Sequence, residues 1–424
     1  MLRHVQRRIV PMPLLRRLYF DNAATSFPKP PEVTQAMLQY MSEVGASPGR
    51  GAYKEAVEAG RTLMRCRELI NRLIHGEDPH HIVFTLNASD SLNLAIKGLV
   101  RHHQRKRESV HVVTTTMDHN SILRPMREIE GDGVQITRVK VDPDSGRIDP
   151  GDIRSAIRAD TRLVALIHAS NVTGAIQPIA VIGAVCRERG AAFLVDAAQT
   201  IGHVPIDVQA VKVDLLAFPG HKGLLGPLGT GGLYLRPGME QVIDTSREGG
   251  TGSASERDTQ PTHMPDKYEP GSHNGPGIAG LAAGVQWILD RGVDAIHDHE
   301  QRLTRILLDG LRELPAVRVL GSREVEHRCG VVSIVIDGME PADLAAILEE
   351  NFGILSRAGL HCAPLAHQAC GTASSGGAVR LSVGPFLTED DARYAVDSIA
   401  EIARETALPA RAAAAPDHVS STRR

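Results

Sequence analysis

Residues 193–236, FLVDAAQTIGHVPIDVQAVKVDLLAFPGHKGLLGPLGTGGLYLR, decide the fold of this chain. They contain short apolar runs rich in Val and Leu and bounded by polar or glycine-rich turns, a pattern typical of buried strands. The first run ends at Asp196, and a glycine-rich turn carrying Lys222 follows the second. Only eight of the 47 basic residues are lysine, so a lysine in this setting is unusual. The runs predict β-strands at 191–196, 213–218 and 232–236.

Similar apolar runs lie upstream of this stretch, with helical patterns between most of them. Alternation of strand and helix implies an α/β fold, with a mainly parallel sheet covered on both faces. Ligands of such sheets bind at the carboxyl ends of the strands, which is where Asp196 and Lys222 lie. The upstream strands are predicted at 81–86, 110–116 and 163–168, and two of the helices at 91–103 and 178–189.

A second pattern begins near Trp287, where long amphipathic stretches flank short apolar strands. It predicts a smaller C-terminal α+β domain, with helices at 294–314, 341–351 and 389–405 and strands at 330–337 and 378–383. We therefore predict an N-terminal extension without fixed structure (1–17), a large domain (18–285), a small domain (286–408) and a disordered tail (409–424).

The composition excludes several classes of protein. The chain has 424 residues, 47 basic and 50 acidic, and this near-balance argues against a nucleic-acid protein. No run reaches the ~18 apolar residues of a membrane span. Five scattered cysteines favour a reducing compartment, and we expect a cytoplasmic protein. The Arg-rich N-terminus lacks the apolar stretch of a secretory signal, although import into an organelle stays open.

Asp196 and Lys222 are ambiguous when each is considered alone. Asp196 suits a helix N-cap, and Lys222 suits a solvated loop. Together they meet the requirements of pyridoxal phosphate, in which a lysine forms a Schiff base and an acid pairs with the pyridinium nitrogen.

The motifs DAAQ (196–199) and GHK (220–222) resemble the class V aminotransferase group of fold type I pyridoxal-phosphate enzymes, in particular the cysteine desulfurases. The resemblance runs from LYFDNAATSFPKP, beginning at Leu18, to VRLSVGPFLTEDD, ending at Asp391. LNASDSLNLAIKG, MDHNS, HASNVTG and YEPGSHN lie between them in the family's order. It implies the fold type I architecture, with a seven-stranded sheet in the large domain.

The resemblance also implies the cofactor contacts. Lys222 matches the Schiff-base lysine and Asp196 the partner of the pyridinium nitrogen. Gln199 matches the residue that binds the phenolic oxygen, and His119 the histidine that stacks on the ring. The full set implied is Ala88, Ser89, His119, Asn171, Asp196, Gln199, His221, Lys222 and Ser272.

The phosphate of the cofactor has its own implied ligands. Ala88 and Ser89 match a turn that opens a helix, where free N–H groups and the helix dipole favour a dianion. His221 matches a further ligand, and Ser272 matches a residue contributed by the partner subunit, which implies a homodimer. One position departs from the family, because Pro219 stands where a Ser or Thr is usual and offers neither a hydroxyl nor an N–H.

The substrate and the reaction are implied by the segment SRAGLHCAPLAHQ (356–368). It resembles the group II (SufS-like) cysteine desulfurases, in which the cysteine matching Cys362 accepts sulfur. The resemblance implies that L-cysteine is converted to L-alanine, with a persulfide on Cys362 passed on to a protein or thiol acceptor, as in iron–sulfur cluster assembly. Arg357 and His361 are cations that would favour the thiolate. The substrate contacts implied are Asn22, Asn171, Arg357 and Arg380. Arg380 matches the arginine that binds the α-carboxylate through a bidentate contact.

Alternatives remain open at this stage. Cys362 could be an inert structural thiol, as many cysteines are. Cys370 has no counterpart in the family and is either a bystander or a resolving thiol. The cluster of His361, Cys362, His367 and Cys370 has poor spacing for zinc, and no metal is predicted. The rival functions are a selenocysteine lyase, an epimerase or an aminotransferase, or a non-catalytic binding protein on the same fold.

Overall fold

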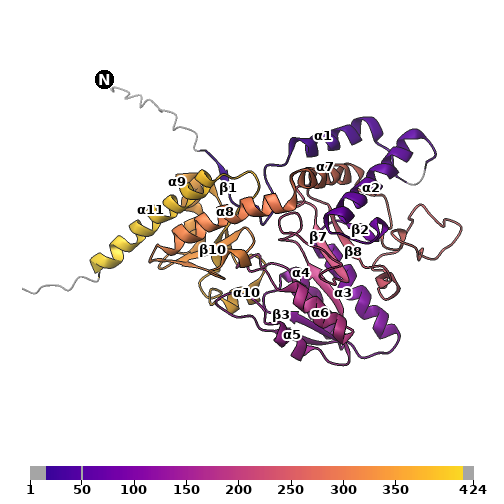
Figure 1. Ribbon diagram of the computed structural model, residues 1–424, viewed down its shortest axis with the longest axis horizontal. Coiled ribbons are helices and arrows are strands. Elements are labelled where there is room, and N and C mark those ends of the chain that lie inside the picture. Colours follow the sequence, from indigo (N-terminus) through magenta and orange to yellow (C-terminus); the bar gives the residue numbers. More distant parts are fainter. Residues whose placement is uncertain (1–15, 49–50, 414–424) are drawn as a thin grey trace, which may run out of the picture.

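The structure, a computed structural model, describes residues 16–48 and 51–413, with side chains to residue 406. Its largest element is a seven-stranded sheet (Figure 1). The strand order is β2 (Ile82–Thr85), β8 (Gly231–Leu235), β7 (Leu215–Pro219), β6 (Ala192–Asp196), β5 (Thr161–Ile167), β3 (His111–Thr115) and β4 (Gln135–Val139). Strand β8 is antiparallel to both neighbours, and the other pairs are parallel. The predicted α/β fold with a mainly parallel seven-stranded sheet is confirmed.

Every residue of β3, β7 and β8 is buried, so both faces of the sheet are covered. Helix α1 packs on α7 and is followed by a π-helical turn (Tyr40–Val44). The helices of this part are α1 (Pro31–Gln39), α2 (Lys54–Leu73), α3 (Ala88–Arg105), α4 (Asn120–Gly131), α5 (Pro150–Ala156), α6 (Ile179–Arg189) and α7 (Gly275–Arg291).

Strand β4 has no counterpart among the predicted strands. Its sequence, QITRV, mixes polar and apolar residues, and only Val139 is buried. Edge strands bury less surface than central ones, so β4 lacks the continuous apolar run seen in β5, β6 and β7.

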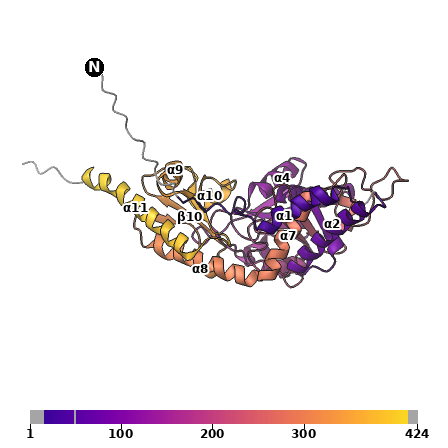
Figure 2. The same ribbon diagram turned by 90° about the horizontal axis from the view of Figure 1, so that it is seen from above.

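The C-terminal part has its own core and its own antiparallel sheet, ordered β12 (Arg357–Gly359), β13 (Ala378–Ser382), β10 (Val331–Ile336) and β9 (Val317–Val319). Helix α8 leads from the large part into this one (Figure 2). The helices of this part are α8 (Val293–Arg312), α9 (Pro341–Phe352), α10 (Pro364–Ala369) and α11 (Glu389–Ala413). We propose that the two cores correspond to the two predicted domains.

Two boundaries differ from the predictions. Strand β1 (Leu18–Tyr19) pairs with β11 (Ile354–Leu355), so the start of the range assigned to the large domain packs with the small one. Helix α11 continues to Ala413, beyond the predicted start of the disordered tail at 409. Residues 1–15 and 414–424, which hold most of the two predicted extensions, lie outside the described residues. None of the helices described is long and apolar enough to cross a membrane.

A buried ion pair joins the two parts. His203 follows β6, and its Nδ1 lies 2.7 Å from Oε1 of Glu300 on α8. Burial lowers the pKa of His203, but the carboxylate of Glu300 outweighs it, and the net shift is above the ordinary 6.5.

Replacing His203 with glutamine should lower the free energy of unfolding by about 3 kcal/mol at pH 6, because Glu300 loses its buried cationic partner. The stabilisation is complete below the unfolded-state pKa of about 6.5 and disappears as the pH rises through the raised folded-state pKa. Denaturant unfolding of both proteins from pH 6 to 9 measures this difference. A difference in the free energy of unfolding that stays constant with pH would contradict this prediction.

Candidate functional site

The carboxyl ends of parallel strands meet at one edge of the large sheet, where they carry most of the predicted site. Strand β6 ends at Asp196, and the turn after β7 carries His221 and Lys222. These residues and side chains following β3 and β5 line a single pocket. The predicted residues brought together there are Ala88, Ser89, His119, Asn171, Asp196, Gln199, His221 and Lys222.

Burial favours the neutral forms of Lys222 and Asp196. It lowers the pKa of Lys222 to about 8, helped by the charge of Arg380 and opposed by that of Asp196. It raises the pKa of Asp196 to about 6, opposed by a hydrogen bond from the Ala198 N–H at 2.9 Å and by Lys222. A lysine with this pKa is partly neutral near pH 7 and can act as a nucleophile or a base.

His119 caps the N-terminus of α4. Its Nδ1 accepts the backbone N–H of Ser121 at 3.1 Å, so a neutral ring carries its proton on Nε2. Burial, followed by the charges of Lys222 and Arg357, lowers the pKa of His119 to about 4. The ring is therefore neutral at neutral pH.

Two helix N-termini converge on one end of the pocket. Ser89 lies in the first turn of α3 and Ser121 in the first turn of α4, and their Oγ atoms are 2.6 Å apart. His221 and Pro219 line the same pocket. The sequence did not single out Ser121, although its place two residues after His119 in MDHNS was a usable signal. The arrangement suits an anion such as a phosphate.

Three buried polar atoms near this pocket have no hydrogen-bond partner within the described part of the chain: Oδ1 of Asn171, Nδ1 of His221 and Nε of Arg380. Buried polar atoms of this kind are rare and are generally satisfied by a ligand or water. Together with the shifted Lys222, they fit a small molecule with anionic ends, as pyridoxal phosphate and an amino acid substrate are.

Arg380 is almost fully buried on β13. Its Nη2 donates to Oδ1 of Asp21 at 2.7 Å, and its Nη1 to the carbonyl of Asn171 at 3.3 Å. Burial lowers the pKa of Arg380, while Asp21 opposes this shift. Asp21, which the sequence analysis missed, therefore orients the predicted carboxylate-binding arginine.

The other predicted substrate residues lie nearby. Asn22 lines a small pocket with Gln199 and Lys222, and its side chain bonds Ser382 O at 3.2 Å. Arg357 is exposed on β12, in register with Arg380. Its charge contributes to lowering the pKa of Lys222. The predicted substrate-binding residues thus come from four separated segments of the sequence.

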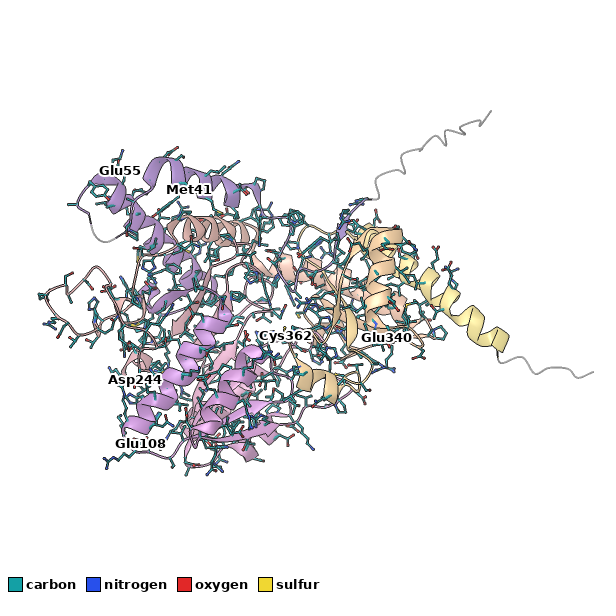
Figure 3. All side chains as sticks on the ribbon, turned by 180° about the vertical axis from the view of Figure 1, so that it is seen from behind. Met41, Glu55, Glu108, Asp244, Glu340 and Cys362 are labelled. Atoms are coloured by element: carbon teal, nitrogen blue, oxygen red, sulfur yellow. The ribbon has the colours of Figure 1, made fainter. Side chains whose placement is uncertain are left out.

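Cys362 is exposed, and Figure 3 shows it where the large and small parts of the molecule meet. It follows β12 in a short turn before α10, at a positive φ of 56°. The expectation that His361 is a cation beside it is wrong, because His361 is buried and its pKa is lowered to about 3. Desolvation of the imidazolium is the cause.

The remaining predicted residues lie elsewhere. Cys370 is buried at the far end of α10, where burial raises its pKa, and it borders a groove separate from the Lys222 pocket. It is therefore poorly placed to resolve a persulfide on Cys362. Ser272 is exposed and lines a separate pocket, outside the Lys222 pocket. Within the described residues, no cluster of three or more His, Cys, Asp or Glu could hold a metal ion.

Comparisons with known proteins agree with this geometry. The model of the class V aminotransferase family matches residues 18–394. A probable cysteine desulfurase of Methanothermobacter thermautotrophicus is 35% identical over 394 residues, covering 92% of this chain and 96% of that protein. Cysteine desulfurase IscS of Vibrio campbellii is 35% identical over 401 residues, covering 90% and 91%. The solved apo structure of cysteine desulfurase from Thermococcus onnurineus NA1 matches with a TM-score of 0.85 and 33% identity, covering 92% and 95%.

Proposed function

Because this chain belongs to the class V aminotransferase family, we propose that it is a cysteine desulfurase that converts L-cysteine to L-alanine and transfers the sulfur to Cys362. The observation that carries the proposal is the exposed thiol of Cys362 on a turn tied to Asn171 of the lysine pocket. An aminotransferase or an epimerase needs no such thiol. The sequence of this segment, SRAGLHCAPLAHQ, supports the group II subtype that it resembles.

The cofactor of the proposed reaction is pyridoxal phosphate. When bound, it withdraws electrons from the substrate Cα and so makes the Cα proton removable. Lys222 would hold it covalently, and Asp196 would face the ring nitrogen. His119, with its neutral flat ring, would lie against the cofactor ring. Ser89 and His221 would bind the phosphate, together with Ser272 of a second copy.

Residues of the chain would bind the substrate, remove the Cα proton and accept the sulfur. Arg380 and Asn171 bind the substrate carboxylate and fix which side of Cα faces Lys222, which takes the Cα proton as a base. The thiolate of Cys362 attacks the substrate sulfur. The sulfur–sulfur bond forms as the carbon–sulfur bond breaks, and the electron pair of the broken bond stays with the carbon skeleton. The Cβ atom gains a proton and Cα regains one from Lys222, leaving alanine and a persulfide on Cys362. A protein or thiol acceptor then removes the sulfane sulfur.

The test is an assay of alanine and sulfide from L-cysteine with a reductant present. We expect equal amounts of alanine and sulfide. Release of alanine from selenocysteine but not from cysteine would instead indicate a selenocysteine lyase. Absence of any product from a chain with bound cofactor would indicate a non-catalytic protein.

Replacing Ser121 with alanine should weaken cofactor binding about tenfold, because Pro219 provides no hydroxyl at the anion-binding end of the pocket and Ser121 provides one. The dissociation constant can be measured by absorbance titration of the stripped protein. Adding Pro219→Ser to Ser121→Ala should restore much of the affinity. Unchanged affinity in Ser121→Ala would contradict this role.

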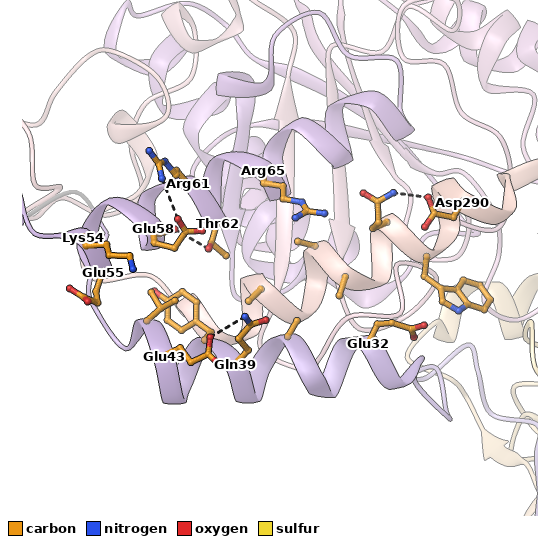
Figure 4. Close-up of a pocket in the computed structure, with 18 of the residues that line it drawn as sticks. Glu32, Gln39, Glu43, Lys54, Glu55, Glu58, Arg61, Thr62, Arg65 and Asp290 are labelled. Atoms are coloured by element: carbon orange, nitrogen blue, oxygen red, sulfur yellow. Dashed lines mark hydrogen bonds and ion pairs between the residues drawn. The ribbon is translucent and has the colours of Figure 1, made fainter.

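We also propose a homodimer. Ser272 lies outside the pocket that it is expected to serve, so a second copy must supply this contact. Figure 4 shows a groove between α1, α2 and α7, and two of these helices also carry exposed apolar side chains, Leu38 on α1 and Val57 on α2. A cytoplasmic location is part of the proposal, since all five cysteines are free. Sedimentation should give a dimer, and a fully active monomer would refute it.

A further inference from the structure

The turn that carries Cys362 has an unusual backbone. The N–H of Ala363 donates to Leu360 O at 2.9 Å and closes the turn. The two central residues, His361 and Cys362, have φ values of 49° and 56°. Turns with two positive φ values are dominated by Gly, Asn and Asp. Because neither central residue here is of that kind, other contacts must hold the turn.

Beneath the turn lie three buried side chains, His361, His367 and Thr372, which we name the histidine chain. Nε2 of His361 is 3.2 Å from the carbonyl of Arg357, and its Nδ1 is 3.2 Å from Nε2 of His367. Nδ1 of His367 is 2.7 Å from Oγ1 of Thr372. The histidine chain therefore links β12, the strand before the turn, to the segment after α10.

The carbonyl at one end determines the proton order along the histidine chain. Arg357 O can only accept, so His361 carries its proton on Nε2 and accepts on Nδ1. His367 must then donate from Nε2, and its Nδ1 accepts the hydroxyl proton of Thr372. Burial lowers the pKa of His361 to about 3 and of His367 to about 4, in agreement with two neutral rings.

The turn is also tied to the cofactor pocket. The carbonyl of His361 accepts Nδ2 of Asn171 at 2.6 Å, and the carbonyl of Cys362 accepts the N–H of Asn120 at 2.8 Å. Asn120 directly follows His119, which lines the pocket. The position of the thiol is thus set by the histidine chain on one side and by the pocket on the other.

We propose that the histidine chain is a positioning device that holds the Cys362 thiol ready for sulfur transfer, without a part in cofactor binding or in removal of the Cα proton. His361 and His367 are in this sense positioning residues, and Cys362 is the catalytic one. The inference rests on the proposed function of Cys362.

His367→Leu removes the donor to His361, whereas His367→Gln keeps an N–H near the position of Nε2. We expect His367→Leu to slow alanine formation from cysteine about 10- to 100-fold, since a small misplacement of a reacting group has effects of this size. Cofactor affinity and exchange of the substrate Cα proton in D2O should match wild type. His367→Gln should restore most of the rate.

Two further variants guard against a simple folding defect. Thr372→Val keeps the shape but removes the hydroxyl that donates to Nδ1 of His367, and should give a smaller loss in the same direction. The matched control is His111→Leu, because His111 is also buried between two threonine hydroxyls, at 2.7 and 2.8 Å, but lies at the opposite end of β3 from the site. It should leave the chemistry of Cys362 unchanged.

Alkylation of Cys362 by iodoacetamide, followed by mass spectrometry, tests the histidine chain even if the wild type forms no alanine and the proposed function fails. The rate should change at least about threefold in His367→Leu and not in His367→Gln or His111→Leu. The proposal is overturned if His367→Leu shows wild-type alkylation and sulfur transfer. It is equally overturned if Cα exchange falls in step with sulfur transfer.

Discussion

Replacing Cys362 with alanine should reduce the release of alanine from cysteine by about three orders of magnitude or more, to near background. The variant keeps Lys222 and the anion-binding end of the pocket, so cofactor binding and Cα proton exchange should remain at wild-type level. No other thiol can substitute, because the remaining four cysteines are buried. Burial raises the pKa of Cys370, and it raises the pKa of the other three, Cys66, Cys186 and Cys329, to about 12.

The matched control for this experiment is Cys370→Ala, which should leave the first turnover intact. Single-turnover alanine formation, with proton exchange followed by NMR in D2O, separates loss of sulfur transfer from loss of the site. Selenocysteine should be affected less by Cys362→Ala, since the carbon–selenium bond is weaker. If Cys362→Ala keeps wild-type alanine release and Cys370→Ala loses it, the sulfur acceptor has been misassigned.

Replacing Lys222 with alanine should remove both the covalent attachment of the cofactor and activity, the latter by several orders of magnitude, since attachment and Cα proton removal depend on the same amine. Borohydride should fix the cofactor to the wild-type chain at Lys222, detected as a mass increase of the peptide, and not to the variant. The matched control is Lys29→Met. Burial also lowers the pKa of Lys29 to about 8, but its Nζ donates to Ser26 Oγ at 2.6 Å and to the carbonyl of His221 at 2.7 Å.

The same lysine predicts a pH dependence of cofactor loading. Only the neutral amine is nucleophilic, and the pKa of Lys222 in the cofactor-free protein is about 8. The rate of covalent loading should therefore rise with pH up to about 8 and level off above it. A rate still rising steeply at pH 10 would show that burial does not act on this amine. Covalent cofactor in Lys222→Ala would show that the lysine was misassigned.

Local sequence was sufficient for the elements that pack on both faces. Strands β5, β6 and β7 contain continuous apolar runs that are almost entirely buried, and hydrophobic patterning detects such runs. Strand β4, half polar at the sheet edge, gave no such signal. Pairing of β1 with β11 joins residues more than 300 positions apart, and no local pattern reports a contact of that kind.

The sequence by itself determined the α/β fold and the family, and through the resemblance it predicted roles for Asp196, Lys222 and Cys362. Only the tertiary structure decided which polar groups satisfy one another. It placed Ser121 against Ser89, Asp21 against Arg380, and His367 beneath the Cys362 turn. It also made His361 neutral, because the cost of burying an imidazolium depends on what surrounds the ring in space. Desolvation and hydrogen-bond pairing are properties of neighbours brought together by folding, and the order of residues along the chain does not state them.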